Sequence, residues 1–262
     1  MKNTAVEWEP GVLGENLDRI EAQISAACRA AGRPRGEVTL MAVSKMHPAS
    51  AILEAEALGV RVFGENRVQE FQEKSALLAG TPRGKPGQAH GELHGEVGQA
   101  GAEFHLIGHL QSNKAARAAE LFASIDTLDS VALAERLNEA AKRAGRRVAV
   151  LIEIKLSHEP SKAGLEPGSA ELPLLLERLP DLTALEFRGL MTVPPFLEDA
   201  AAVRPYFSQL RVLRDEMAAA YPRLSFTELS MGMSHDFPVA IAEGATQVRI
   251  GTALFGRRIY PQ

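Results

Sequence analysis

A lysine closes the first apolar stretch of the chain, in "VTLMAVSKMHP" at residues 38 to 48. Most lysines at the end of such a stretch are solvated. A lysine that is withdrawn from water, however, has a lowered ammonium pKa, and its amine can then attack an aldehyde. Lys45 is therefore a candidate for Schiff-base chemistry, provided that the fold places a suitable ligand beside it.

Glycines and hydroxyl residues near the end of the chain could bind a phosphate. Glycine leaves backbone N–H groups open to close approach, and hydroxyl groups add hydrogen-bond donors. The candidates are Ser230, Gly232, Ser234, Gly251 and Thr252. Each one alone is equally consistent with a helix cap or a tight turn. Together with a reactive amine they would suit either pyridoxal phosphate or the phosphorylated sugar of an aldolase.

Short apolar stretches alternate with helical ones and predict the fold that must position these residues. The predicted strands are "VTLMAVS", "RVFGE", "FHLIG", "SIDTL", "VAVLIEIK", "EFRGLMTV", "FTELSMG" and "QVRIG". Helical spacing is found at residues 48–58, 130–144 and 203–217. The alternation indicates parallel strands with helical crossovers. We therefore predict an α/β chain with a single-domain (β/α)8 TIM barrel, in preference to an open doubly wound sheet.

The barrel would bring the candidate residues together. Active sites of such barrels lie at the C-terminal ends of the strands, and the last strand neighbours the first. We expect Lys45 to be the last residue of strand one, with Gly251 and Thr252 at the end of strand eight. Loops after strands seven and eight commonly hold a phosphate in this fold.

Two segments lie outside the barrel pattern. Residues 1–36 are expected to form an N-terminal helix packed on the barrel of residues 37–262, with an apolar stripe of Leu13, Leu17, Ile20, Ile24 and Ala27. The stretch "GTPRGKPGQAHGELHGEVGQAG" at residues 80 to 101 carries seven glycines and two prolines. Such a composition predicts a mobile surface loop.

Composition narrows the function classes. A net charge of -4, with no block of like charges, gives no support to nucleic-acid or anionic-membrane binding. The single cysteine, Cys28, rules out an intramolecular disulfide. The chain shows neither a signal-peptide pattern nor an apolar run of about eighteen residues, so we expect a cytoplasmic protein. No metal site is expected, because no acidic or thiol ligand accompanies the histidines His90, His94, His105 and His109 at a known metal-ligand spacing.

Several motifs together resemble a known family. They are "AVSKMHP", "FGENRVQE", "FHLIGHLQSNK", "SKAGL", "GLMTVPP" and "LSMGMSHDFPVAIAEGATQVRIGTALFG". The chain resembles the pyridoxal-phosphate homeostasis protein family, a single-domain relative of the barrel of bacterial alanine racemases. The resemblance runs from about residue 38 to residue 256, and it favours the cofactor over the sugar phosphate.

The resemblance implies roles for individual residues. Lys45 would form the internal aldimine, a Schiff base, with pyridoxal 5'-phosphate. Phosphate contacts are implied for Ser230, Gly251 and Thr252, and Asn66 in "GEN" would be a further pocket residue. The chain departs from the family at His109, where proline is more usual, and in the insertion at residues 80 to 101. Neither departure touches the implied lysine or phosphate positions.

Arg249 matches the arginine that racemase-like barrels point at the pyridine nitrogen. A permanently cationic guanidinium favours the unprotonated nitrogen and makes the ring a weaker electron sink, which restrains carbanion chemistry. The competing interpretation is that Arg249 pairs with a barrel glutamate, such as Glu153 or Glu228.

The resemblance also bears on turnover. Related racemases take a second acid/base from a C-terminal β domain and a partner subunit, whereas only "RRIYPQ" follows Gly256. We therefore expect a monomer without a second catalytic group, and Tyr260 as a surface or packing residue. The preferred hypothesis is a protein that holds pyridoxal phosphate on Lys45 and buffers or delivers it, with amino acids or apoenzymes as partners. The alternatives are a racemase-like enzyme and a structural scaffold.

Overall fold

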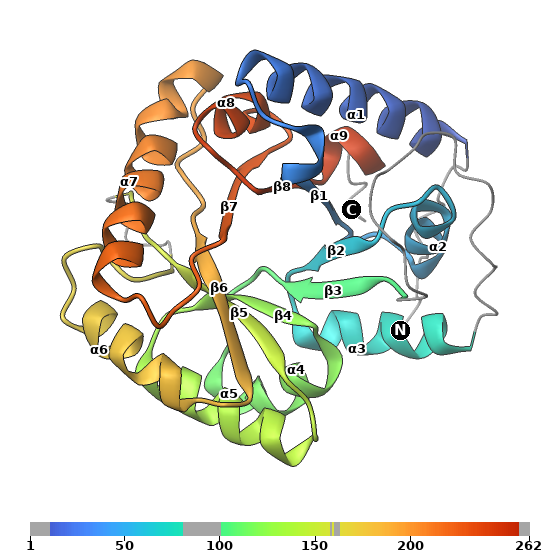
Figure 1. Ribbon diagram of the computed structural model, residues 1–262. Coiled ribbons are helices and arrows are strands. Elements are labelled where there is room, and N and C mark those ends of the chain that lie inside the picture. Colours follow the sequence, from blue (N-terminus) through green and yellow to red (C-terminus); the bar gives the residue numbers. More distant parts are fainter. Residues whose placement is uncertain (1–10, 81–100, 158, 160–162, 257–262) are drawn as a thin grey trace.

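The computed structural model describes residues 11–80, 101–157, 159 and 163–256. In this part of the chain the strands form a closed parallel barrel, β1 to β8 in sequence order (Figure 1). β1 pairs with β2 on one side and with β8 on the other, which closes the sheet. The strands are Thr39–Val43 (β1), Val62–Glu65 (β2), Glu103–Leu106 (β3), Ser124–Leu128 (β4), Val148–Glu153 (β5), Leu185–Met191 (β6), Glu228–Met233 (β7) and Gln247–Ile250 (β8). The predicted barrel is confirmed.

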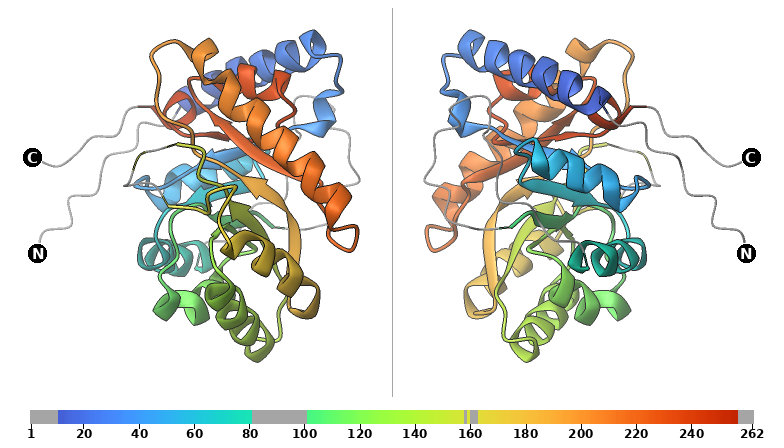
Figure 2. Two further views of the ribbon diagram at one scale, coloured as in Figure 1. Left: turned by 90° about the vertical axis from the view of Figure 1, so that its left-hand side faces the viewer. Right: turned by 90° about the vertical axis from the view of Figure 1, so that its right-hand side faces the viewer.

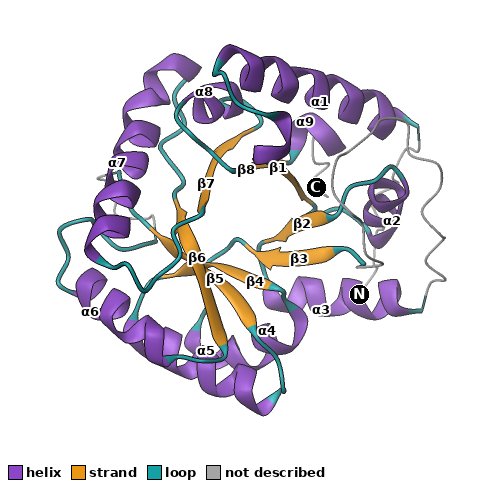
Figure 3. Ribbon diagram, viewed as in Figure 1, coloured by secondary structure: helices purple, strands orange, loops and turns teal. Residues whose placement is uncertain are grey.

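Helices form a ring around the barrel, as the secondary-structure colouring of Figure 3 shows. They are Val12–Ala30 (α1), Ala49–Ala57 (α2), Val68–Ala79 (α3), Ala115–Leu121 (α4), Val131–Arg143 (α5), Glu171–Arg178 (α6), Arg204–Ala220 (α7), Phe237–Ala242 (α8) and Thr252–Phe255 (α9). Short 3₁₀ turns lie at Arg35–Glu37, Ser112–Lys114, Leu179–Asp181 and Ala200–Val203. Within the described ranges, no helix is both long and apolar enough to cross a membrane.

Side chains alternate along each strand between the helix layer and the barrel interior. On β1, Leu40 and Ala42 belong to the apolar core that the strands share with the surrounding helices. Met41 and Val43 therefore face the interior. The same alternation on the other strands decides which polar residues meet inside the barrel.

β1 ends two residues earlier than the sequence pattern predicts. The strand covers Thr39–Val43, and Lys45 lies in the turn that follows. The chain leaves the sheet because His47 N–H donates to Ser44 O at 3.0 Å, and because Met46 has a left-handed φ of 64°. The expectation that Lys45 is the last strand residue is wrong, although Lys45 stays at the C-terminal end of β1.

The predicted N-terminal helix is present as α1, which packs against α8 and α9 (Figures 1 and 2). Its stripe of Leu13, Ile20 and Ile24 is fully buried. Asn16 Nδ2 donates to Leu254 O at 3.0 Å, which ties α1 to the segment that follows β8.

The glycine-rich stretch joins α3 to β3. Only its first and last residues, Gly80 and Gly101, are described. The predicted mobile loop, with His90 and His94, lies outside the described residues, and so does Tyr260.

Candidate functional site

Lys45 lies at the C-terminal mouth of the barrel, the end at which the strands finish. Ser44 Oγ donates to Glu65 Oε1 at 2.7 Å, and Glu65 lies on the outer face of β2 toward α3. Lys45 follows Ser44 in the turn, two residues after the interior-facing Val43. The lysine is half-buried, as an amine that must lose part of its hydration requires.

A second lysine, Lys74 on α3, fixes this turn from outside the barrel. Its Nζ lies 2.9 Å from Glu65 Oε1 and 2.8 Å from Glu70 Oε1, and it donates to Ser44 O at 2.9 Å. Glu70 in turn accepts from Met46 N–H at 2.5 Å. Burial raises the pKa of Glu65, while Lys74 and Ser44 favour its ionised form. This cluster was not predicted from the sequence.

The ends of β7 and β8 meet around the hydroxyl of Ser234. Its Oγ accepts from Gly251 N–H and from Ala253 N–H, both at 3.3 Å. A Cβ added at Gly251 would lie 3.4 Å from Val43 Cβ, two residues before Lys45. The exposed Thr252 begins α9 at the same place. These backbone donors and hydroxyls therefore lie beside the strand that leads to Lys45.

Gly232 shapes the turn after β7. Its φ is 92°, and a Cβ there would lie 2.6 Å from Ala240 Cβ and 3.1 Å from Phe237 Cα. Glycine is thus needed both for the backbone conformation and for the close approach of α8. Asp236 accepts from Met233 N–H at 2.6 Å and fixes the same turn.

Arg249 lies in the barrel interior and is almost completely buried. Its Nη1 donates to Ser230 Oγ at 2.7 Å, and its Nη2 donates to Thr192 O at 2.8 Å. Gln247 Nε2 also donates to Ser230 Oγ, at 3.0 Å. Burial lowers the pKa of Arg249, and nearby carboxylates oppose this effect. Ser230 therefore lies beside the Arg249 guanidinium. The hydroxyl beside the Gly251 N–H group is that of Ser234.

The sequence analysis considered Glu153 and Glu228 as partners of Arg249. Glu228 pairs instead with Arg188 at 3.5 Å. Glu153 ends β5, and burial raises its pKa to about 7, although the charge of Arg249 acts in the opposite direction. Glu153 is thus a buried carboxyl near the guanidinium whose protonated form is favoured by burial.

Asn66 follows β2 at the same mouth and packs against the segment after β3. A Cβ added at Gly108 would lie 2.2 Å from Asn66 O and 2.7 Å from its Oδ1. Gly108 O accepts from Thr127 Oγ1 at 3.0 Å, which anchors this approach to β4. The unusual His109 is next in sequence, and its Nδ1 lies 3.3 Å from Asp129 Oδ2.

His105 lies inside the barrel, apart from Lys45. Its Nδ1 is 3.3 Å from Asp126 Oδ2. Burial opposes protonation of the imidazole, but Asp126 outweighs this effect and the pKa of His105 rises to about 9. In the part of the chain that the structure describes, no three histidine, cysteine or acidic side chains are grouped as metal ligands.

Comparison with known proteins identifies the relatives of this barrel. The family described as "Alanine racemase, N-terminal domain" matches residues 16–259. The pyridoxal phosphate homeostasis protein of Aquifex aeolicus is 41% identical over 246 residues, covering 94% of this chain and 98% of the relative. The protein of the same name from Escherichia coli K12 is 41% identical over 253 residues, covering 95% and 97%.

Solved structures give the same relationship. PipY of Synechococcus elongatus with PLP bound is 41% identical, with a TM-score of 0.76, and the match covers 93% of this chain and all of PipY (100%). An alanine racemase of Clostridium difficile has a TM-score of 0.63 at 17% identity, and the match covers 95% of this chain but 57% of the racemase. The second likeness is one of fold alone.

Proposed function

Because this chain belongs to the pyridoxal phosphate homeostasis proteins, within the alanine racemase N-terminal domain family, we propose that it binds pyridoxal 5'-phosphate at the C-terminal mouth and serves in the homeostasis of that cofactor. The observation that carries the proposal is the adjacency of two elements. Lys45 is in the turn after β1, two residues past Val43, and the Ser234–Gly251 contact adjoins Val43.

The residues present fit the cofactor. The N–H groups of Gly251 and Ala253 donate to Ser234 Oγ at 3.3 Å. A phosphate would take the place of that hydroxyl as their acceptor, while Ser234 and Thr252 would donate to it from their own hydroxyls. The Gly232 turn, which has no room for a side chain, would support them. When bound, pyridoxal phosphate supplies an aldehyde that condenses reversibly with a primary amine. Lys45 is the amine that we assign to this attachment.

Arg249 would act on the pyridine ring. Ser230 and Thr192 hold its guanidinium in one orientation inside the barrel. A guanidinium donates hydrogen bonds and does not accept them, so opposite the pyridine nitrogen it favours the unprotonated form. This arrangement suits a protein that holds the cofactor better than one that stabilises carbanions. Asn66, at the end of β2, is assigned to the rim of the same pocket.

Attachment is tested with purified full-length protein that is incubated with pyridoxal phosphate, reduced with borohydride and mapped by peptide mass spectrometry. We expect a pyridoxyl group on Lys45. The Lys45→Ala variant should lose this adduct completely and keep the circular-dichroism spectrum of the parent. The matched control is Lys155→Ala, two residues beyond the end of β5, which should retain the adduct.

An adduct on Lys155 or on surface lysines, with Lys45 unmodified, would refute the attachment site. A protein that neither takes up pyridoxal phosphate nor changes its absorbance spectrum would refute the cofactor itself.

The finer parts of the proposal concern what happens to the bound cofactor. We assign the chain a buffering or delivering role, with pyridoxal-phosphate-requiring apoenzymes or amino acids as partners, and we propose that it acts as a cytoplasmic monomer. Transfer to an added apoenzyme from loaded protein, faster than from free cofactor at the same concentration, is the expected result. Equal rates would contradict delivery. Gel filtration with light scattering tests the monomer.

The racemase-like alternative has weaker support. The likeness to alanine racemase is one of fold at 17% identity, and this chain matches 57% of that enzyme. Exchange of the α-hydrogen of an amino acid for solvent deuterium, well above the rate with free cofactor, would favour the enzyme.

A further inference from the structure

The opposite end of the barrel carries a second site. At the N-terminal mouth, where the strands begin, a pocket of about 430 Å³ opens between β3, β7, β8 and the segment before β1. Its volume falls in the range of small-molecule sites, roughly 300–1,000 Å³, and far exceeds the space that one water fills. The charged residues that line it are Arg33, Glu37, Glu103, His105, Arg188 and Glu228. We call it the mouth pocket.

Charges of both signs face the mouth pocket in equal number. Three of the lining residues are carboxylates, and three are cationic when His105 is protonated. Asp126 outweighs the opposing effect of burial and favours the protonated imidazole, with the pKa of His105 raised to about 9. An ion of one sign would therefore leave charges of the other sign unmatched, whereas a ligand with both signs would match them.

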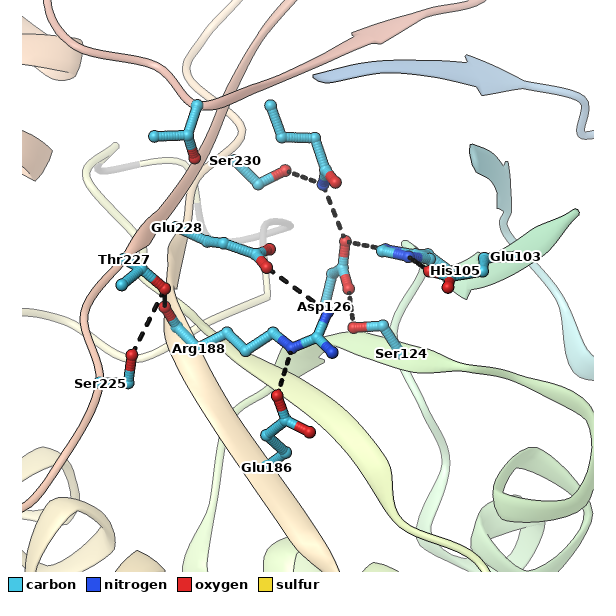
Figure 4. Close-up of polar contacts among 12 residues, drawn as sticks. Glu103, His105, Ser124, Asp126, Glu186, Arg188, Ser225, Thr227, Glu228 and Ser230 are labelled. Carbon is cyan, nitrogen blue, oxygen red and sulfur yellow. Dashed lines mark hydrogen bonds and ion pairs between the residues drawn. The ribbon is translucent and has the colours of Figure 1, made fainter. Parts of the chain in front are cut away.

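The ion pairs across the mouth pocket are long. Arg188 Nη1 lies 3.5 Å from Glu228 Oε1, and His105 Nε2 lies 4.0 Å from Glu103 Oε2 (Figure 4). Charge-assisted hydrogen bonds are ordinarily about 2.7–2.9 Å. By contrast, Arg33 donates to Ile241 O and Ala245 O at 2.9 Å and is already satisfied. Arg188 Nε also donates to Glu186 Oε1 at 3.0 Å, so the capacity for a ligand lies at Arg188 Nη1 and at His105 Nε2, where the pairs are long.

The burial of Glu228 also indicates that the carboxylates of the mouth pocket can take up a cationic ligand group. Glu228 is partly buried at the start of β7, and desolvation raises its pKa although Arg188 is near. Desolvation is thus the main cost of the ionised form, and a ligand ammonium group beside Glu228 would stabilise that form. On the cationic side, His105 is 4% exposed and its Nδ1 is held by Asp126, so its Nε2 is directed to the pocket.

We propose that the mouth pocket binds a free α-amino acid, with its ammonium group toward Glu228 and Glu103 and its carboxylate toward Arg188 and His105. The ligand class follows from the paired charges and the pocket volume. The inference does not rest on the proposed function, because the two mouths are built from different residues.

Three matched probes test the proposal. L-alanine carries both charges, propionate lacks the ammonium group, and ethylamine lacks the carboxylate. Each is titrated into the full-length Lys45→Ala chain, which removes the amine at the other mouth, while the ring nitrogens of His105 are followed by ¹⁵N NMR. We expect saturable shifts with L-alanine, and affinity at least about tenfold weaker for the other two probes.

Variants locate the site. Arg188→Gln and Glu228→Gln should each weaken L-alanine binding about tenfold or more. The matched control is Arg178→Gln, which removes a surface guanidinium that pairs with Glu135 and should leave binding unchanged.

Absence of a saturable shift at about 10 mM L-alanine would overturn the proposal. Equal binding of propionate would show an anion site, and equal binding of ethylamine a cation site, and both results would also overturn it. The probe comparison needs no pocket variant, so it decides the question even if a variant fails to fold.

Discussion

Around Ser234 and Gly251 at the C-terminal mouth the polar contacts run to backbone atoms, whereas at the N-terminal mouth they run mainly between charged side chains. Ser234 accepts from the N–H groups of residues 251 and 253, and Arg249 donates to a carbonyl. At the other end, Arg188 meets Glu186 at 3.0 Å and Glu228 at 3.5 Å. The first arrangement presents a fixed shape to a phosphate, while the second presents charges that can re-pair with an incoming ion.

The comparison also explains how the two mouths differ in rigidity. Backbone donors are held by the strands and turns themselves and cannot rotate away. Long side chains at a partly exposed site pay rotamer entropy for each fixed contact, so their pairs contribute little to stability. We therefore expect substitutions that support the C-terminal mouth to cost much more folding free energy than those at the N-terminal mouth.

The largest effect on stability is expected from Lys74→Met. The change leaves the buried Glu65 and the partly exposed Glu70 without their cation, which should cost about 3–5 kcal/mol in the free energy of unfolding at pH 7, measured in urea. The loss should be smaller at pH 5, because Glu65, whose pKa is already raised, can take up a proton. A Glu65→Gln change added to Lys74→Met should recover part of the stability. A loss below about 1 kcal/mol would show that the cluster does not support the turn.

The next largest effect on stability is expected at Gly232, one of two glycines, with Gly251, beside the proposed phosphate site. Gly232→Ala combines a positive φ with a 2.6 Å contact to Ala240 Cβ, and should destabilise the protein by about 2–4 kcal/mol. Gly251→Ala is the matched control, because its added Cβ would meet Val43 Cβ at an ordinary 3.4 Å. It should cost less than about 1 kcal/mol. Equal losses in urea unfolding would show that the Gly232 turn can relax.

The free energy of unfolding should depend on pH in two successive windows, one set by Glu153 at the C-terminal mouth and one by His105 inside the barrel. The Glu153 carboxyl holds its proton more tightly in the folded state, with a pKa raised from 4.5 to about 7, so stability falls as pH rises through that window. His105 is stabilising when protonated, and its contribution is lost as pH rises from 6.5 to about 9. Each step should be about 1–3 kcal/mol.

Urea unfolding of the protein without cofactor, measured from pH 4 to pH 10, checks both windows. Glu153→Gln should flatten the lower step, and His105→Gln should flatten the upper step. If either variant kept the pH profile of the parent, the corresponding assignment would be wrong.

The smallest effect is expected at the N-terminal mouth itself. Arg188→Gln removes a partly exposed guanidinium and should change the free energy of unfolding by less than about 1 kcal/mol. A loss as large as that of Lys74→Met would show that the charges of the mouth pocket are a structural network and would remove the contrast between the mouths.

The sequence predicts those features of the fold that depend on local patterns. Alternating apolar stretches and helices predict the barrel, and Lys45 is found at the C-terminal end of β1, as barrel geometry requires. The end of β1 was misplaced because the apolar run continues past Val43, while the turn depends on contacts from α3 and on the left-handed Met46. The roles assigned to Ser230 and Asn66 in cofactor binding stay predictions.

Contacts between distant residues could not be predicted from one sequence. Glu65 and Lys74, or His105 and Asp126, meet only because separate elements pack together. One signal was present, however. Lys74 follows Phe71 by three residues and precedes Leu78 by four, which places a lysine on the apolar stripe of α3. A lysine on a buried stripe requires a carboxylate partner.

The position of Lys45 depends on the number of residues between it and the barrel layer. Val43 faces the interior, Ser44 contacts Glu65, and Lys45 follows in the turn. Loss or gain of one residue at this point would move the amine relative to the barrel mouth. Among members of this family, we therefore expect the segment between β1 and α2 to vary in sequence but to keep its length.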